Sequence, residues 1–290
     1  MVQEILLDEQ IEWPKPYKCA VTLIFNYQGA EGLEPGPNGK IDNEIYSERE
    51  YGPRAGIWRI LRLLEKQNVK ATFAVCGGLA ERYPATVKAI HAAGHEVAGH
   101  GYHHELAWKL SRDQELETIT KTTDILGSLT DERIRGWRCC FQSHNTPELV
   151  LEQGFLWNSN SFSHDFPYLL RKDGRVTVEI PRQPFGDMRV YGHEDFGNPG
   201  AALDVWRRAF DTFYYESELF HTFCPFSFHP YISGRPGRIE VLSELIEYIK
   251  SHQGVWIATC EEIAKISLEC AAVKTGKPDI RETPGLAASR

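Results

Sequence analysis

The 290-residue sequence contains no apolar run approaching the ~20 residues that a membrane-spanning helix requires. It also lacks an excess of positive charge, because 32 Lys and Arg residues face 40 Asp and Glu residues and leave a formal net charge of −8. A net negative charge repels phosphate backbones and anionic membranes, so we expect neither a nucleic-acid partner nor a membrane partner. Its first residues, MVQEILLDEQIEWP, lack the basic and apolar regions of a secretory signal, and we therefore expect a cytoplasmic protein.

Paired cysteines are also missing. The seven cysteines are an odd number, are scattered over a long chain, and form no CxxC motif. This pattern indicates reduced thiols rather than a disulfide framework or a cysteine-based zinc site. The adjacent Cys139 and Cys140 are predicted to be ordinary packing residues, although their roles stay open.

What the sequence does contain is an alternation of short apolar runs with amphipathic stretches, typical of repeated strand and helix units. About eight strands are expected, and we predict a distorted (β/α)7 barrel in a single domain, with a doubly wound open sheet as the alternative. The expected strands lie near 19–25, 70–76, 96–99, 134–137, 155–158, 176–180, 222–228 and 255–259, and the expected helices near 55–67, 85–93, 112–129, 147–153, 202–215 and 239–252.

Two segments do not fit this alternation. Residues 29–53 are rich in Gly, Pro, Asn and Glu and predict a long loop, which in such folds is usually functional or disordered. The C-terminal residues have the composition of a loose tail or of an arm that packs on a partner subunit. We therefore divide the chain into an N-terminal arm (1–17), a barrel (18–268) that includes the long loop, and a tail (269–290).

The segment GHEVAGHGYHHE, residues 94–105, is the most informative one for chemistry, because a predicted strand ends there in three histidines. His100 and His104 have the spacing HxxxH and could converge on one divalent transition metal such as Zn²⁺. Without a ligand, the same residues would be ordinary surface or core histidines.

Polar residues also follow other predicted strands. Asn26 and Gln28 end the first strand, but they are amides and cannot act as a general base near pH 7, so Glu31 is the nearest candidate for that role. His229 ends a later strand and fits a general acid that protonates a leaving nitrogen. Candidates for substrate binding are Tyr27, Gln28, Trp137, Arg138, Asp165 and Tyr231.

Five segments in this order, the strand ending near Asn26, GHEVAGHGYHHE, RGWR, GFLWNSNSFSHDFPY and FHP…GRPGRIEVLSELIEYI, resemble the polysaccharide deacetylase (NodB-homology, carbohydrate esterase 4) superfamily. The long loop and the GRPGR turn are most similar to the branch of allantoinase-type ureide hydrolases, cyclic imidases and cytoplasmic peptidoglycan-deacetylase-like proteins. The resemblance runs from about residue 18 to 265. It implies a distorted (β/α)7 barrel, a homo-oligomer such as a dimer or tetramer, and hydrolysis of non-peptide carbon–nitrogen bonds.

The same resemblance assigns roles to individual positions. It implies metal ligation by His100 and His104 and catalysis by His229, and it aligns the acidic residue of the family's aromatic-lined motif with Asp165. The family's first motif carries two aspartates, a base and a ligand, whereas Asn26 and Gln28 stand in that region here. Arg138 is followed by Cys139 and Cys140, where the family usually has Ser-Pro or Ala-Pro.

Three functions are therefore compared. The first is hydrolysis of a small amide, ureide or cyclic imide by metal-activated water, with a metal-free site as a variant. The second is N-deacetylation of an N-acetylated sugar, which an extended groove with an exposed Trp would favour. The third is a catalytically silent barrel that binds a small ligand, favoured by the missing first-motif carboxylates and opposed by the presence of His100, His104 and His229.

Overall fold

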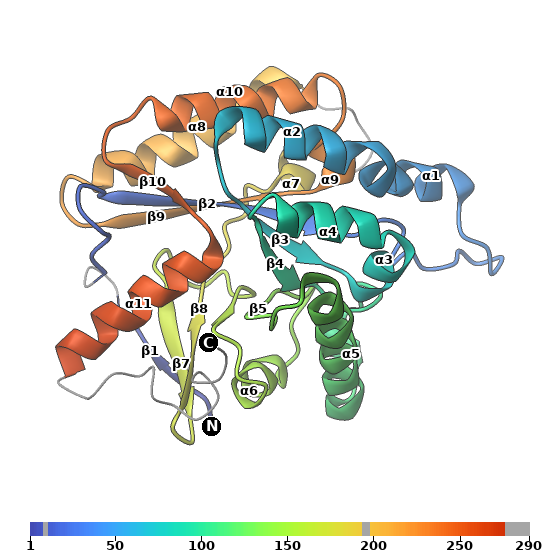
Figure 1. The fold of residues 1–290 in the computed structure, drawn as a ribbon, viewed down its shortest axis with the longest axis horizontal. Helices are drawn as coiled ribbons and strands as arrows, with labels where there is room; N and C mark the ends of the chain where they lie inside the picture. The colour runs from blue at the N-terminus through green and yellow to red at the C-terminus, as the bar shows by residue number, and fades with distance from the viewer. Residues whose placement is uncertain (8–10, 193–197, 276–290) are drawn as a thin grey trace.

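The computed structural model describes residues 1–7, 11–192 and 198–275, whose strands form one sheet (Figure 1). Parallel strands in the order β9-β2-β3-β4-β5-β6-β8 curl into an incomplete barrel, β7 and β1 continue it antiparallel, and β10 pairs with the first half of β2. This agrees with the predicted distorted (β/α)7 barrel. The strands are β1 Gln3–Ile5, β2 Cys19–Tyr27, β3 Thr72–Val75, β4 Glu96–Gly99, β5 Gly136–Trp137, β6 Trp157–Asn158, β7 Tyr168–Lys172, β8 Arg175–Glu179, β9 Thr222–Phe228 and β10 Val255–Ala258.

Strand β2 is the central strand of the barrel, and all nine of its residues are buried. Side chains of a strand alternate between its two faces. Here Val21, Leu23 and Phe25 belong to the apolar cluster beneath the outer helices, whereas Ala20 and Ile24 belong to a separate cluster inside the barrel. The same alternation places Asn26 on the interior face of β2, and Gln28 follows directly after the strand.

Helices cover the outside of the barrel, and α2, α8 and α10 lie together beyond β2 and β9 (Figure 1). Helix α5 begins as the sequence indicates, because Ser111 and Gln114 form a reciprocal capping box. The α-helices are α1 Asn43–Tyr51, α2 Ile57–Gln67, α3 Gly77–Arg82, α4 Pro84–Ala92, α5 Arg112–Thr130, α6 Thr146–Glu152, α7 Asp187–Tyr191, α8 Pro199–Glu216, α9 Pro230–Ser233, α10 Arg238–Lys250 and α11 Cys260–Thr275; Gly52–Gly56 form a π-helical turn and Ala107–Lys109 a 3-10 turn.

Two predicted boundaries need correction. The loop predicted at 29–53 contains α1, which starts where the Asp42 side chain accepts hydrogen bonds from the backbone N–H groups of Glu44 and Ile45. The tail predicted to begin at 269 continues α11 as far as Thr275, because Ile263, Leu268 and their neighbours pack against the interior of the barrel. The remaining tail residues, 276–290, lie outside the described residues.

The end of the barrel beneath α11 contains a partly buried glutamate, Glu96. Its side chain accepts hydrogen bonds from Thr72 Oγ1 at 2.6 Å, Trp157 Nε1 at 2.6 Å and the backbone N–H of Glu261 at 3.0 Å. Burial is the largest influence on this carboxyl and raises its pKa to about 7, although these hydrogen bonds oppose the shift. Glu96 therefore links the sheet to the start of α11.

We expect this carboxyl to make folding pH-dependent. Because the pKa of Glu96 is raised, the folded state holds a proton that the unfolded state releases between about pH 4.5 and 7, and stability falls as pH rises through this range. The loss is on the order of 3 kcal/mol at most. Urea unfolding at pH 5 and pH 8 should show a smaller difference for Glu96→Gln than for the wild type and for the control Glu261→Gln; equal differences would contradict the assignment.

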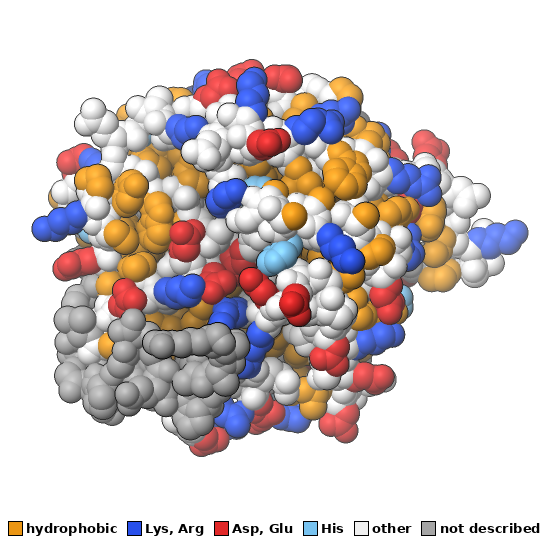
Figure 2. Space-filling view, viewed as in Figure 1, with side chains coloured by type: hydrophobic (Ala, Val, Ile, Leu, Met, Phe, Trp, Pro, Cys, Tyr) orange, Lys and Arg blue, Asp and Glu red, His pale blue; other side chains and the backbone are white. Residues whose placement is uncertain are grey.

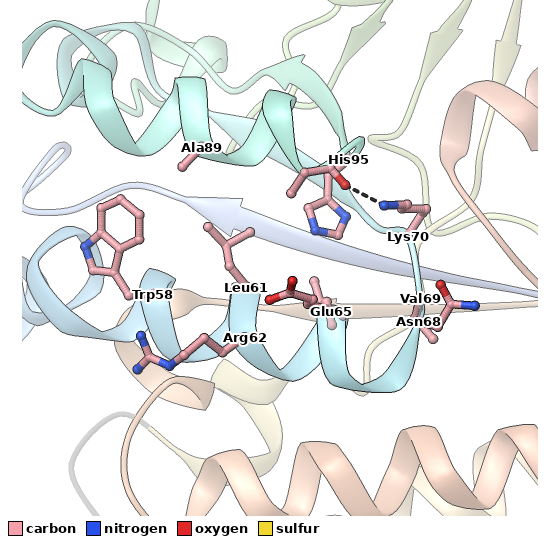
Figure 3. A pocket seen from close by; sticks show the side chains of 11 residues that line it. Trp58, Leu61, Arg62, Glu65, Asn68, Val69, Lys70, Ala89 and His95 are labelled. Carbon is pink, nitrogen blue, oxygen red and sulfur yellow. Dashed lines mark hydrogen bonds between the residues drawn. The ribbon is translucent and has the colours of Figure 1, made fainter.

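The outer surface has hollows on the helical side. One of about 360 Å³ lies between α2 and α4, lined by Trp58, Leu61, Ala89 and His95 among others (Figure 3). It lies away from the carboxyl ends of the barrel strands. Side chains of both charges are spread over the face in Figure 2, and none of the helices in the described part of the chain has the length and apolarity that a membrane span requires.

Candidate functional site

Four parallel strands, β2, β4, β5 and β9, end at one edge of the barrel and bring polar side chains together. Arg138 Nε donates to Asn26 Oδ1 at 2.7 Å, and His100 Nδ1 donates to the carbonyl oxygen of Arg138 at 2.5 Å. Asn26 Nδ2 lies 3.4 Å from His229 Nε2, and the ring of His104 lies 4.9 Å from the ring of His100. We call Asn26, His100, His104, Arg138 and His229 the strand-end cluster.

His229 is held by a buried carboxylate, Asp187. Asp187 accepts hydrogen bonds from His229 Nδ1, from the backbone N–H of His229 and from Ser233 Oγ, each at 2.7 Å. A carboxylate on Nδ1 fixes the proton there, so Nε2 carries the lone pair and faces Asn26 Nδ2. The pair therefore presents a histidine nitrogen that can take up and release a proton.

His100 is neutral and, like His229, is held through a hydrogen bond at Nδ1. Its pKa lies well below the usual range because of burial, and His104 lowers it further. Since the Arg138 carbonyl can only accept, the proton of the neutral ring is on Nδ1. Nε2 is buried and has no hydrogen-bond partner in the described part of the chain, so it offers a lone pair to a ligand.

His104 has a left-handed backbone with φ of 57°, which is uncommon for a residue other than Gly. Its pKa is lowered to about 3, first by burial and then by the charges of His229, Arg49 and Arg182. Gly32 allows the approach, because a Cβ there would lie 3.0 Å from His104 Nδ1. The strained conformation places a neutral imidazole beside His100.

Arg138 is a fully buried guanidinium whose side-chain partners are neutral. Besides Asn26, it donates to Ser159 Oγ at 2.9 Å and to Ser227 Oγ at 2.7 Å. Burial lowers its pKa well below the usual range. Because Arg138 holds Asn26 Oδ1, the Nδ2 amide of Asn26 is directed toward His229 as a hydrogen-bond donor.

The predicted binding residues divide between the two faces of their strands. The Tyr231 ring lies beside the cluster, 5.5 Å from that of His229. Gln28 is fully buried and neither polar atom of its side chain has a partner among the described residues. Tyr27 is instead on the outer face, where its hydroxyl donates to Thr86 Oγ1 at 2.9 Å, and the Trp137 ring packs outward 5.8 Å from that of Phe155. The structure therefore does not bring Tyr27 or Trp137 to the cluster.

The two acidic residues predicted for the site lie elsewhere. The Glu31 carboxylate is buried and forms an ion pair with Arg82, so it is not available as a base beside His229. Asp165 is exposed and accepts a hydrogen bond from Gln183 Nε2 at 2.6 Å. The acidic residue of the site is Asp187.

Asp187 and the two arginines Arg49 and Arg182 are not among the residues predicted from the sequence. The only sequence signal for Asp187 is an acidic residue between apolar neighbours in PFGDMRV, which is weak.

The family model described as polysaccharide deacetylase matches residues 40–152. A Schizosaccharomyces pombe protein assigned to the polysaccharide deacetylases is 31% identical over 87% of this chain and 91% of its own length. The chain belongs to the polysaccharide deacetylase family. A peptidoglycan deacetylase of Helicobacter pylori is 27% identical over 86% of this chain and 94% of its own length. The crystal structure of Puue allantoinase is 30% identical, with a TM-score of 0.81, and the match covers 88% of this chain and 91% of that chain.

Deacetylases of this family are generally metal-dependent, but the residues of the strand-end cluster do not fit a firmly held divalent cation. Within residues 1–7, 11–192 and 198–275, no three His, Cys, Asp or Glu side chains are arranged to hold a metal. His100 Nε2 is free, but the end of β2 offers the amides Asn26 and Gln28 and no carboxylate that would attract a cation. The nearby guanidinium groups of Arg138, Arg182 and Arg49 add repulsion.

Proposed function

We propose that this chain hydrolyses the carbon–nitrogen bond of a small amide, ureide or cyclic imide, with His229 as the acid–base group. The observation that carries the proposal is the Asp187–His229 pair, in which Nδ1 is held and Nε2 faces the other residues of the cluster. With Glu31 paired to Arg82, His229 is the acid–base group best placed in the cluster.

In this proposal His229 moves the proton, and the other residues of the cluster bind and orient the substrate and the water. His229 Nε2 accepts a proton from the attacking water and returns it to the departing nitrogen. Asn26 Nδ2, oriented by Arg138, donates to the carbonyl oxygen on which negative charge develops. The free lone pair of His100 Nε2 accepts a hydrogen bond from the water or from a substrate N–H.

N-deacetylation of an N-acetylated sugar is the second candidate, because aromatic side chains are exposed on segments that follow the cluster. Trp108, Phe141 and Phe162 are 59%, 59% and 48% exposed. Exposed aromatic rings of this kind could stack on a sugar ring. The names of the related deacetylases point in the same direction.

A substrate panel distinguishes these functions. We would assay ureides, cyclic imides and small amides by loss of the starting compound, and N-acetyl sugars by acetate release. Hydrolysis of ureides, imides or amides that is lost in His229→Ala supports the proposal. Acetate release from N-acetyl sugars alone supports the deacetylase function. No turnover of any compound would support a catalytically silent barrel that binds a ligand. Cytoplasmic location and homo-oligomerisation stay predictions.

Metal analysis tests the predicted ligation by His100 and His104. We expect the untagged wild-type protein to hold well below one equivalent of Zn, Co, Ni or Fe, because in the described part of the chain no third His, Cys, Asp or Glu joins His100 and His104 in a metal-binding group. Gln28→Glu should raise the metal content, since it adds a charged oxygen ligand at the end of β2, whereas Gln183→Glu, beside exposed Asp165, should not. About one chelator-removable equivalent in the wild type, with loss of turnover on removal, would restore the metal-dependent mechanism.

A further inference from the structure

Two guanidinium groups, those of Arg49 and Arg182, flank the strand-end cluster without an acidic partner among the described residues. Arg49 lies on α1, and its Cζ is 4.3 Å from the centre of the Tyr231 ring. Arg182 follows β8, and its Cζ is 4.8 Å from the centre of the Phe162 ring. Its Nε is buried and has no hydrogen-bond partner within the described ranges. Both side chains are partly buried, so neither is an ordinary solvated surface charge.

The two guanidinium groups lie on either side of the strand-end cluster. The Tyr231 ring that Arg49 covers lies 5.5 Å from the His229 ring. On the other side, the backbone N–H of Arg182 donates to the carbonyl oxygen of Ser161 at 2.8 Å, two residues beyond Ser159, whose hydroxyl accepts from Arg138. Burial raises the pKa of the Cys140 thiol, two residues after Arg138, to about 11. Cys140 is therefore a neutral neighbour and does not compensate the arginines.

The nearby carboxylates are already occupied. Glu179 accepts hydrogen bonds from the side chain of Asn158 and from the backbone N–H groups of Asn160 and Ser161, and it forms no ion pair with Arg182 in the described structure. Asp187 is used by His229 and Ser233. Burying a positive charge without a counter-charge costs free energy. An anion that binds beside the charge offsets this cost, so such a site favours anion binding.

We propose that the substrate carries a carboxylate, bound by Arg182 and Arg49 while its amide or ureide group reaches His229. This inference rests on the proposed function, because the carboxylate is placed relative to the same histidine. A guanidinium matches the planar carboxylate with parallel hydrogen bonds, and Arg182 Nε is a donor free for such a contact. The substrate is thus a small acid that also contains an amide.

Equilibrium binding tests this without requiring turnover. Isothermal titration at low salt would compare succinamate, which has one carboxylate and one amide, with the neutral succinamide. We expect succinamate to bind at least tenfold more tightly, and this preference to shrink at high salt. Arg182→Gln and Arg49→Gln should each weaken succinamate binding by about 10-fold or more and leave succinamide binding unchanged.

Matched variants separate charge from packing. Arg189→Gln is the control, because the Arg189 guanidinium also lies over the Phe162 ring, at 5.3 Å, but is exposed. It should bind succinamate as the wild type does, and Arg182→Lys, which keeps the charge, should retain part of the affinity. Equal loss in Arg189→Gln, equal binding of the two probes, no succinamate binding, or tighter binding of inorganic phosphate would overturn the inference.

The inference and the proposed function can fail separately. If neutral amides are hydrolysed and succinamate has no advantage, the carboxylate assignment fails and the hydrolase stands. If succinamate binding depends on Arg182 but no carbon–nitrogen bond in the panel is cleaved, the anion site stands and the hydrolase fails.

Discussion

His229→Gln is expected to lower kcat by about 10²- to 10⁴-fold and to change KM little. The reason is geometric: the lone pair of His229 Nε2 points into the cluster, where Asn26 Nδ2 contacts it only at 3.4 Å, and Glu31, the alternative base, is paired with Arg82. A glutamine keeps a polar side chain of similar reach but cannot take up a proton near pH 7. Steady-state kinetics on the best substrate from the panel measure both constants.

Two neighbouring substitutions sharpen this test. Asp187→Asn removes the charge that holds the His229 proton on Nδ1, so kcat should fall nearly as far while the fold is kept. Ser233→Ala removes only one of the three hydrogen bonds to Asp187 and should cost far less. A rise in KM with unchanged kcat in His229→Gln would make His229 a binding residue and would contradict the acid–base role.

The positions that the sequence predicts well are those at the ends of buried strands. Runs such as CAVTLIF identify the strands, and the carboxyl ends of parallel strands meet at one edge, so Asn26, His100, Arg138 and His229 could be expected to lie together. The assignment of faces was less successful. Tyr27 follows Asn26 directly and so points to the opposite face of β2, toward Thr86.

Residues from irregular segments could not be predicted in the same way. Asp187 stands at the start of the short helix α7, far along the chain from His229, and only the tertiary fold brings the two together. Arg49 belongs to α1, which the Gly- and Pro-rich composition of 29–40 concealed. Asp165, chosen instead for its aromatic neighbours, is exposed. Local periodicity carries no information about such long-range pairs.

Gly56→Ala is expected to lower both stability and activity, because the helices outside the barrel position His229, the acid–base group of the proposed function. A Cβ on Gly56 would lie 2.1 Å from the backbone oxygen of Pro230, far inside van der Waals contact. A backbone atom cannot rotate away, so α9 must move relative to the start of α2. Overpacking of this kind costs about 3 kcal/mol. Urea unfolding would measure the loss as a lower midpoint.

The same displacement of α9 should also lower kcat. Pro230 follows His229 directly, and Ser233 at the end of α9 donates to Asp187, so a shift of α9 disturbs the Asp187–His229 pair. We therefore expect kcat to fall in Gly56→Ala even at temperatures where the variant is fully folded. Gly200→Ala is the control, because the nearest atom to its added Cβ is Asn198 Oδ1 at an ordinary 3.4 Å, and it should leave both quantities unchanged. Wild-type stability and kcat in Gly56→Ala would show that α9 and α2 can separate without moving His229.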